Sequence, residues 1–171
     1  MSAAVHFSLA RMSLSLRLVS VGLFIIPASH LWIATIVPEP LSSVFLGVAG
    51  LVLVAFLAVP VFFRPIGFEV HGHTLTIRWL LRSRSIDLTG ASVTTISRDE
   101  LNRQYGLGIR IGAGGLGGAF GLYRTAKETF GLFVSTLDDW VLLRPVVGRA
   151  LLITPEQPLR FIGIIERAGE R

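Results

Sequence analysis

Glu69, His71 and His73 are the side chains whose types and spacing best suit a metal ion. Residues two apart lie on the same face of a β-strand, so an unbroken strand would present one oxygen and two nitrogen ligands, a set that suits zinc. Gly72 lies between the two histidines and favours a turn, which would separate the three side chains. We therefore expect two ordinary turn histidines here and no metal site.

Paired acidic residues are the second group that could do chemistry, and they occur as Asp99-Glu100 and Asp138-Asp139. Adjacent residues point in opposite directions in extended chain, so neither pair supports catalysis by two carboxylates. The chain has no G-x-S-x-G nucleophile motif and no metalloprotease helix motif. It also has no cysteine, which excludes thiol nucleophiles and disulfides. We expect a protein that is not an enzyme and has no cofactor.

A glycine-rich segment, residues 112–121, contains six glycines: Gly112, Gly114, Gly115, Gly117, Gly118 and Gly121. The first, second and fourth of these match G-x-G-x-x-G and follow residues typical of a strand, which is half of a dinucleotide-binding context. The other half is missing, because more glycines follow at the point where a helix should begin. A structural role in positive φ angles, a bulge or close backbone passage is favoured. A flexible contact loop for lipid or protein stays open.

Three arginines, Arg78, Arg82 and Arg84, follow the last long apolar stretch within about 21 residues. A basic patch beside a membrane attracts anionic lipid, at about 1 kcal/mol for each charge. The patch would thus be a candidate site for lipid or a partner, and the alternative is an ordinary exposed strand face. Three more arginines would extend it if they faced the same way: Arg98, Arg103 and Arg110.

The elements that must position these residues include two candidate membrane spans. Residues 18–37 and 41–63 form stretches of 20 and 23 residues without one charged side chain, separated by Pro38-Glu39-Pro40. At about 1.5 Å per residue, each can cross a hydrocarbon core of about 30 Å. We expect an N-terminal segment at 1–17, a transmembrane hairpin at 18–63 and a single domain at 64–171.

Basic residues lie before the first span and after the second, whereas the connecting tripeptide has none: Arg11, Arg17, Arg64, Arg78 and Arg82. By the positive-inside rule, both termini should be cytoplasmic. The competing interpretation is a cleaved signal peptide with residues 18–26 as its apolar core. It is disfavoured because the apolar run continues to Val37 without a clear cleavage site.

The second span carries a stripe of small residues, Ser43, Gly47 and Gly50, at positions i, i+4 and i+7. Such residues share one helix face and let another helix approach closely. Packing of the two spans against each other explains the stripe, and a homodimer through the same stripe stays open.

After Pro65 the pattern changes to short alternating runs typical of strands. In residues 73–79, Leu75, Ile77 and Trp79 alternate with Thr74, Thr76 and Arg78. Further strands are expected at 68–70, 82–88, 91–97, 105–111, 131–136, 141–145 and 149–153. A capping box at Thr154 predicts a final helix at 156–167. We expect a small antiparallel barrel of about seven strands, closed at one end by that helix.

This order of elements is that of pleckstrin-homology (PH) domains, and three segments carry a more specific resemblance. Residues 112–121 look like the glycine-rich segment of a bacterial PH-like family whose members often place it after two transmembrane helices. Residues 67–77 are similar to the family's opening strands, and 152–161 resemble its helix entry, with departures at His71, His73 and Gln157. The resemblance covers residues 64–167 and the two spans. It implies a PH-like barrel at the bacterial inner membrane, and it brings no catalytic residues.

The sequence therefore predicts a membrane-anchored, non-enzymatic PH-like interaction domain at the cytoplasmic face. Its ligand is a protein partner or an anionic phospholipid, with the protein favoured. From Arg64 onward, 14 basic residues stand against 10 acidic ones, an excess too small to indicate a nucleic-acid partner. The alternative is an accessory or regulatory subunit of a small oligomeric transport or channel complex.

Overall fold

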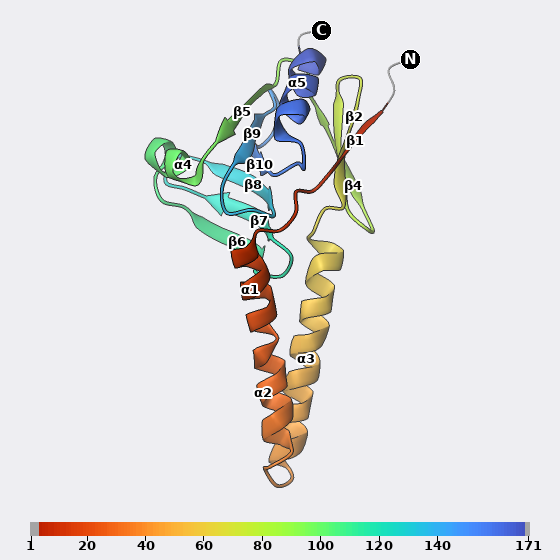
Figure 1. Ribbon diagram of the computed structural model, residues 1–171, viewed down its shortest axis with the longest axis vertical. Coiled ribbons are helices and arrows are strands. Elements are labelled where there is room, and N and C mark those ends of the chain that lie inside the picture. Colours follow the sequence, from red (N-terminus) through yellow and green to blue (C-terminus); the bar gives the residue numbers. More distant parts are fainter. Residues whose placement is uncertain (1–3, 170–171) are drawn as a thin grey trace.

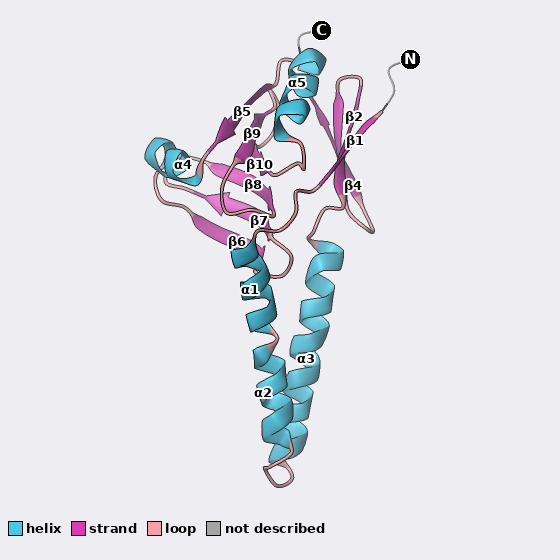
Figure 2. Cartoon of the chain, in the orientation of Figure 1, coloured by secondary structure: helices cyan, strands magenta, loops and turns pink. Residues whose placement is uncertain are grey.

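The computed structural model describes residues 4–169 and shows a helical hairpin that projects from a β-rich domain (Figures 1 and 2). Two helical stretches are long and apolar enough to cross a membrane. They are Leu14–Ala34 with 21 residues and Leu41–Phe62 with 22. Both expected spans are therefore present as helices.

The first span consists of two helices, α1 (Leu14–Leu23) and α2 (Ile25–Ala34), which meet at Phe24. Pro27 explains the interruption, because a proline has no N–H to bond the carbonyl four residues earlier and its ring collides with that carbonyl. The helical part also begins at Leu14, ahead of the expected start at residue 18.

The second span is one helix, α3 (Leu41–Phe62), which packs on α2. Ala49 is fully buried in this contact. The rings of Phe24 and Phe56 meet edge to face with centroids 5.4 Å apart. Most other side chains of the hairpin are apolar and point outward, which suits a hydrocarbon surrounding.

Within residues 4–169, ten strands form two sheets. The first sheet has the order β1-β2-β3-β4, with β1 (Val5–Ser8), β2 (Gly67–His71), β3 (Thr74–Arg78) and β4 (Ser83–Asp87). The second has the order β5-β9-β10-β8-β7-β6, with β5 (Ser92–Ile96), β6 (Ile109–Gly114), β7 (Ala119–Arg124), β8 (Thr129–Val134), β9 (Trp140–Arg144) and β10 (Leu151–Ile153).

This architecture corrects the expected barrel of about seven antiparallel strands. Neither sheet closes on itself within the described residues, and β10 pairs with β8 in parallel. Strands β1 and β7 have no counterpart among the expected strands. The first is only four residues long and precedes a long apolar stretch, and the second begins inside the glycine-rich segment, where glycines hide the alternation.

An unexpected helix, α4 (Arg98–Tyr105), follows β5. The Ser97 hydroxyl caps it by accepting the backbone N–H of Glu100 at 3.1 Å. Ser97 and Glu100 have the spacing of a capping box, so the sequence did contain a signal for this helix. The strand expected at 105–111 is therefore wrong at its start, because Tyr105 ends α4 and β6 begins at Ile109.

The final helix, α5 (Pro158–Gly169), begins two residues later than expected. The capping box at Thr154 is wrong, because its hydroxyl oxygen accepts the backbone N–H of Ser135 at 2.8 Å. The Gln157 carbonyl instead accepts the N–H of Phe161 at 2.9 Å. Pro158 therefore occupies the first helical position, where a missing N–H costs nothing.

Two apolar cores lie on the two faces of the six-stranded sheet. The inner core lies between the two sheets, and α5 inserts Phe161 and Ile165 into it. Phe161 meets Phe7 of β1 edge to face, with ring centroids 5.1 Å apart. The outer core lies on the opposite face, beneath α4, and includes Leu101 and Trp140.

The helical hairpin is the connection between two neighbouring strands. Strands β1 and β2 pair antiparallel with Ser8 opposite Gly67, so residues 9–66 join them. The strands approach so closely at this point that a Cβ on Gly67 would lie 2.8 Å from the Phe7 carbonyl oxygen. The segment ahead of the hairpin thus contributes a strand to the domain, and the hairpin is mounted on the sheet at both of its ends.

Candidate functional site

The end of α3 is capped by side chains from the β3–β4 turn. Trp79 Nε1 donates to the Phe63 carbonyl at 3.0 Å, and Arg82 Nη2 donates to the Phe62 carbonyl at 3.1 Å. The Arg82 guanidinium also lies over the Trp79 ring, with Cζ 4.8 Å from the centroid. A helix C-terminus has unpaired carbonyls and a partial negative charge, so a cation satisfies both.

The three arginines Arg78, Arg82 and Arg84 do not converge. Arg78 lies opposite Ser83, and its guanidinium pairs with Glu69 at 3.0 Å. Arg84 lies opposite Ile77 and therefore on the other face of the sheet, since directly paired residues share a face. Arg82 alone of the three bonds to the end of a membrane helix.

The glycine-rich segment forms the β6–β7 hairpin. Gly112 and Gly121 face each other across the two strands with φ angles of +136° and +131°. A Cβ on either would collide with a carbonyl oxygen of the opposite strand. Strand β7 begins at Ala119 and no helix begins at Gly117, so the G-x-G-x-x-G match lies in a hairpin.

The turn of this hairpin, residues 115–118, contacts α1. The Ser20 hydroxyl bonds the Gly115 carbonyl and accepts the N–H of Gly117 at 3.3 Å. A Cβ on Gly115 would lie 2.9 Å from Leu23 Cδ1. The glycines therefore permit a close approach between the β6–β7 turn and α1. Ser20, an isolated hydroxyl in an apolar run, is the residue that sequence reasoning missed here.

Backbone hydrogen bonds hold the linker that enters α1. The Ala10 N–H donates to the Thr154 carbonyl at 2.8 Å, and the Ser13 N–H donates to the Ser135 carbonyl at 3.1 Å. The Ser135 hydroxyl donates back to the Ala10 carbonyl at 2.6 Å. The start of α1 is thus tied to the residues that follow β8 and β10.

A cavity of about 390 Å³, the α1 cavity, lies between α1 and the outer face of the six-stranded sheet. Leu132, Val134 and Trp140 contribute to its apolar floor on the sheet. Helix α1 contributes Leu16 and Val19 as one wall. Two arginines also line it: Arg98 and Arg110.

The two cavity arginines come from different elements. Arg98 is the first residue of α4, and Arg110 lies on β6 opposite Tyr123, whose ring belongs to the outer core. The sequence identified both as candidates but did not indicate which way they face. Pairing with Tyr123 places Arg110 on the cavity side of the sheet.

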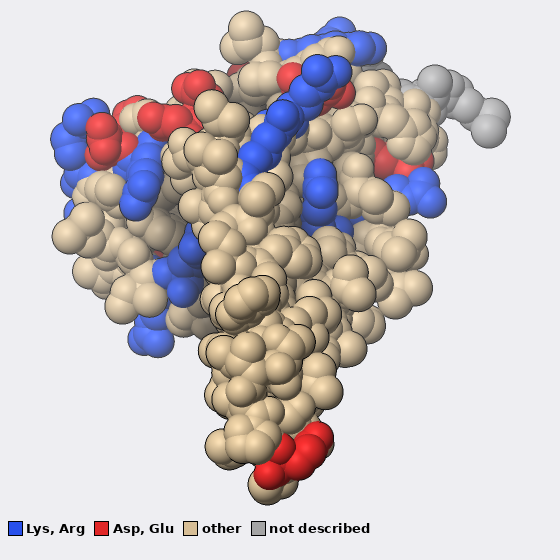
Figure 3. Space-filling view, turned by 60° about the horizontal axis from the view of Figure 1, so that its bottom comes forward, with Lys and Arg blue, Asp and Glu red and all other residues tan. Residues whose placement is uncertain are grey.

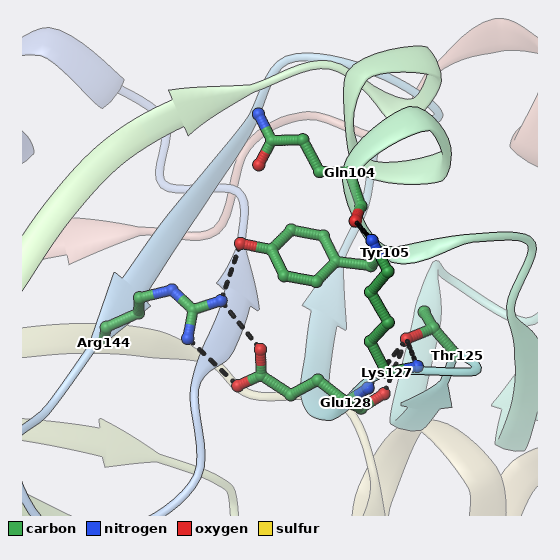
Figure 4. A network of polar contacts seen from close by, with 6 residues as sticks. All are labelled: Gln104, Tyr105, Thr125, Lys127, Glu128 and Arg144. Atoms are coloured by element: carbon green, nitrogen blue, oxygen red, sulfur yellow. Dashed lines mark hydrogen bonds and ion pairs between the residues drawn. The ribbon is translucent and has the colours of Figure 1, made fainter.

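A polar network holds α4 in place (Figure 4). Arg144 makes two bonds to the Glu128 carboxylate, at 3.0 and 2.8 Å, and donates to the Tyr105 hydroxyl at 2.8 Å. The hydrogen bonds to Glu128 raise the pKa of Arg144 above its ordinary value, so it stays charged. At the other end of α4, the Arg98 N–H donates to Asp138 Oδ1 at 3.0 Å. Both ends are fixed, which positions Arg98 at the cavity.

A second hollow of about 430 Å³, the α3 hollow, lies where α3 enters the domain. Its lining includes Leu9, Pro60, Ile66 and Leu80 and one charged residue, Arg64. The guanidinium of Arg64 lies beside Gly117 of the glycine turn, so it extends from the α3 side towards the α1 side.

The side of the domain that faces the hairpin combines basic and apolar side chains. Figure 3 shows Lys and Arg around the base of the hairpin, and Asp and Glu mainly towards the rim of the domain and at the hairpin tip. Leu80 and Leu81, in the β3–β4 turn beside the end of α3, are 63% and 67% exposed. Such a surface suits the boundary between water and lipid.

The remaining candidate residues lie apart. Glu69 pairs with Arg78. Gly72 has a φ of +57° and forms the expected turn. His73 lies in this turn, and its Nδ1 contacts the Ala168 carbonyl of α5. Among residues 4–169 no three His, Cys, Asp or Glu side chains are grouped to hold a metal ion.

The small-residue stripe of α3 faces away from α2. Ser43, Gly47 and Gly50 are all exposed, and nothing lies within 4 Å of a Cβ placed on either glycine. Packing of α2 on α3 therefore does not use this stripe.

Comparisons of the chain with protein-family models, curated proteins and solved structures found no match.

Proposed function

We propose that this protein is a membrane-anchored, non-enzymatic interaction domain whose hairpin-facing side rests on an anionic leaflet. The observation that supports this most directly is the β3–β4 turn. Arg82 bonds the end of α3, and this places the exposed Leu80 and Leu81 beside the point where the chain leaves the membrane. Apolar side chains beside a cation gain from burial in the headgroup region and from attraction to anionic lipid.

The proposed orientation puts the domain in the cytoplasm of a bacterium. Arg17 lies in the first turn of α1 and Arg64 follows α3, whereas the hairpin tip carries Glu39 and no basic residue. Short segments that flank a membrane span and carry basic residues are usually cytoplasmic. A reporter enzyme that works only outside the cytoplasm should be active when it is fused at Glu39. Activity there of a reporter that works only in the cytoplasm would overturn this topology.

We further propose a PH-like affiliation for the domain. In its favour, two sheets enclose a core into which a C-terminal helix inserts aromatic and aliphatic side chains. The ten strands and the parallel pair of β8 and β10 depart from that pattern. The affiliation therefore rests on the glycine-rich segment, the helix entry and the two-span order.

Of the two ligand classes expected from the sequence, the geometry of the hairpin-facing side favours anionic lipid. That side lies against the membrane, where a lipid is always present and a folded partner would have to displace it. A protein partner remains a prediction for the surfaces that face away from the hairpin.

Hydrogen exchange on the full-length protein in lipid nanodiscs tests the proposal. Amides of residues 80–83 should exchange more slowly in discs that contain phosphatidylglycerol than in discs of phosphatidylcholine alone, and added salt should reduce the difference. The β2–β3 turn, residues 72–73, lies at the opposite end of the same strands and serves as the control. Equal exchange of residues 80–83 in both lipids would overturn the proposal.

A second candidate function, the regulatory subunit of an oligomeric membrane complex, is favoured by the outward stripe on α3. The chain has no cysteine, so single cysteines can be introduced cleanly. Ser43→Cys should form disulfide-linked dimers in native membranes, whereas Val48→Cys, an exposed position about 140° around α3 from Ser43, should not. Equal crosslinking at both positions would remove this candidate.

A further inference from the structure

We propose that the α1 cavity binds one anionic phospholipid drawn from the adjoining leaflet. The lipid phosphate lies between Arg98 and Arg110, and part of an acyl chain covers the apolar floor on the six-stranded sheet. The inference deepens the proposed function, on which it rests, because it adds a defined single-lipid site to a domain seated on lipid.

The size and lining of the cavity fit such a ligand. Its volume of about 390 Å³ lies within the usual range for small-molecule pockets, about 300–1,000 Å³. Its sheet floor, formed by Leu132, Val134 and Trp140, is at most 5% exposed, whereas Val19 and Leu137 also line the cavity and are 50% and 41% exposed. An acyl chain resting on that floor would remove the exposed apolar surface of Val19 and Leu137 from water.

The two arginines supply the charge recognition. Within residues 4–169, neither Arg98 nor Arg110 has a carboxylate within the 4.0 Å of an ion pair. The nearby Asp138 accepts the backbone N–H groups of Arg98 and Asp139 at 3.0 and 3.2 Å, so backbone donors engage its carboxylate. Both guanidinium groups therefore have donors to offer a phosphate.

Glycine makes room for one of these arginines. A Cβ placed on Gly114 would lie 2.6 Å from Arg110 Cζ, so any other residue there would displace the guanidinium. This gives Gly114, one of the glycines singled out in the sequence, a role in positioning a charge at the cavity.

The route into the cavity favours a lipid over free phosphate. Leu16 and Val19 belong to the first membrane-spanning stretch and form one wall, so the cavity adjoins the bilayer surface. A free phosphate would use the two arginines but gain nothing from the apolar floor. A phospholipid uses both and is present at that depth.

Native mass spectrometry of the full-length protein in a neutral detergent tests this site. Dioleoyl phosphatidylglycerol should bind as one molecule per chain, and dioleoyl phosphatidylcholine should bind at least about tenfold more weakly. The variant Arg98→Gln/Arg110→Gln should bind phosphatidylglycerol about thirtyfold more weakly, at roughly fivefold for each lost charge. The matched control Arg103→Gln/Arg149→Gln loses the same charge outside the cavity and should bind as the wild type does.

Three outcomes would overturn the proposal. They are equal binding of the two lipids, unchanged binding by the cavity variant, and displacement of the lipid by millimolar inorganic phosphate. The lipid preference and the phosphate competition use the wild-type chain, so they decide the matter even where the variant does not fold. Because this test has no bilayer, its failure leaves the exchange result in nanodiscs intact, and the two proposals can fail separately.

Discussion

The two arms of the helical hairpin enter the same domain through different surroundings. The end of α3 is closed by Trp79 and Arg82, whose donors satisfy its last carbonyls. The start of α1 is held by backbone bonds to Ser135 and Thr154 and by the Ser20 contact with the glycine turn. Arg98 and Arg110 line the cavity beside α1, and within residues 4–169 neither side chain makes a hydrogen bond to that helix. Side-chain donors therefore hold the α3 junction, whereas backbone hydrogen bonds and one serine hydroxyl hold the α1 junction.

The hollows at the two junctions show the same difference. The α3 hollow is mainly apolar, and its single charge, Arg64, lies beside Gly117. The α1 cavity has two arginines from separate elements around a sheet floor. Within residues 4–169 neither of these two exposed arginines forms an ion pair, so both guanidinium groups have donors to offer an anion. The contrast is a reason to expect recognition at α1 and support at α3.

The largest effect should come from releasing β1, which holds the α1 side of the hairpin on the domain. Phe7→Ala removes a buried ring that packs on Phe161 and should lower the stability of the domain by about 3–4 kcal/mol. Thermal unfolding of the full-length protein in detergent measures it. His6→Ala, on the exposed face of the same strand, should change stability by less than about 0.5 kcal/mol. A small effect at Phe7 would mean that β1 does not anchor α1.

A second variant tests the β6–β7 hairpin, whose turn contacts α1. Gly121→Ala forces a side chain into a φ of +131° and against the Ile111 carbonyl, and should cost about 2–3 kcal/mol. The control is Gly163→Ala in α5, where nothing lies within 4 Å of the new Cβ and alanine should stabilise by about 0.5–1 kcal/mol. If Gly121→Ala were neutral, the glycine segment would not be needed for the fold, and a contact role alone would remain.

Local patterns predicted the parts of the fold that depend on local physics. Charge-free length indicated both spans, and period-two alternation indicated the β2–β3 hairpin and most later strands. The interruption at Phe24 could have been expected from Pro27, and α4 from the Ser97 and Glu100 spacing. In both places the signal was present and a longer pattern, an apolar run or an alternating strand, obscured it.

The features that the sequence did not reveal depend on contacts between distant residues. Pairing of Val5–Ser8 with β2 spans the whole hairpin, and the parallel pairing of β10 with β8 has no local signature. The same applies to the site. Arg98 and Arg110 were visible as charges, but their convergence requires α4 to fold over the sheet and β6 to turn towards α1.

The α3 junction should respond to the loss of its charged cap by loosening locally. Arg82→Gln removes the guanidinium from the Phe62 carbonyl and the Trp79 ring, and should cost about 1 kcal/mol. Faster hydrogen exchange should appear at the last turn of α3 while α1 is unchanged. Arg84→Gln is the matched control, because Arg84 lies two residues further along the chain and, within residues 4–169, makes no hydrogen bond to α3. Equal loosening at both helices would mean that the two junctions are not independent.

The smallest effect should arise in the four-stranded sheet, at a site that touches neither junction. The Thr89 backbone N–H and hydroxyl donate to Asp87 at 2.9 and 2.8 Å, and these bonds lower the pKa of Asp87 below its ordinary 3.8. Because the folded pKa is the lower one, the carboxylate stabilises the fold above pH 3.8, and this contribution is lost as the pH falls through the lowered pKa. The melting temperatures of the wild type and Asp87→Asn should therefore differ at neutral pH and converge in acid. Thr89→Val keeps the Asp87 charge and removes one of its two donors. In that background, Asp87→Asn should change the melting temperature at neutral pH by less than it does in the wild type. A difference between the wild type and Asp87→Asn that persisted at pH 2 would show that Asp87 acts through packing instead of charge, and the α1 and α3 junctions should be unaffected in either case.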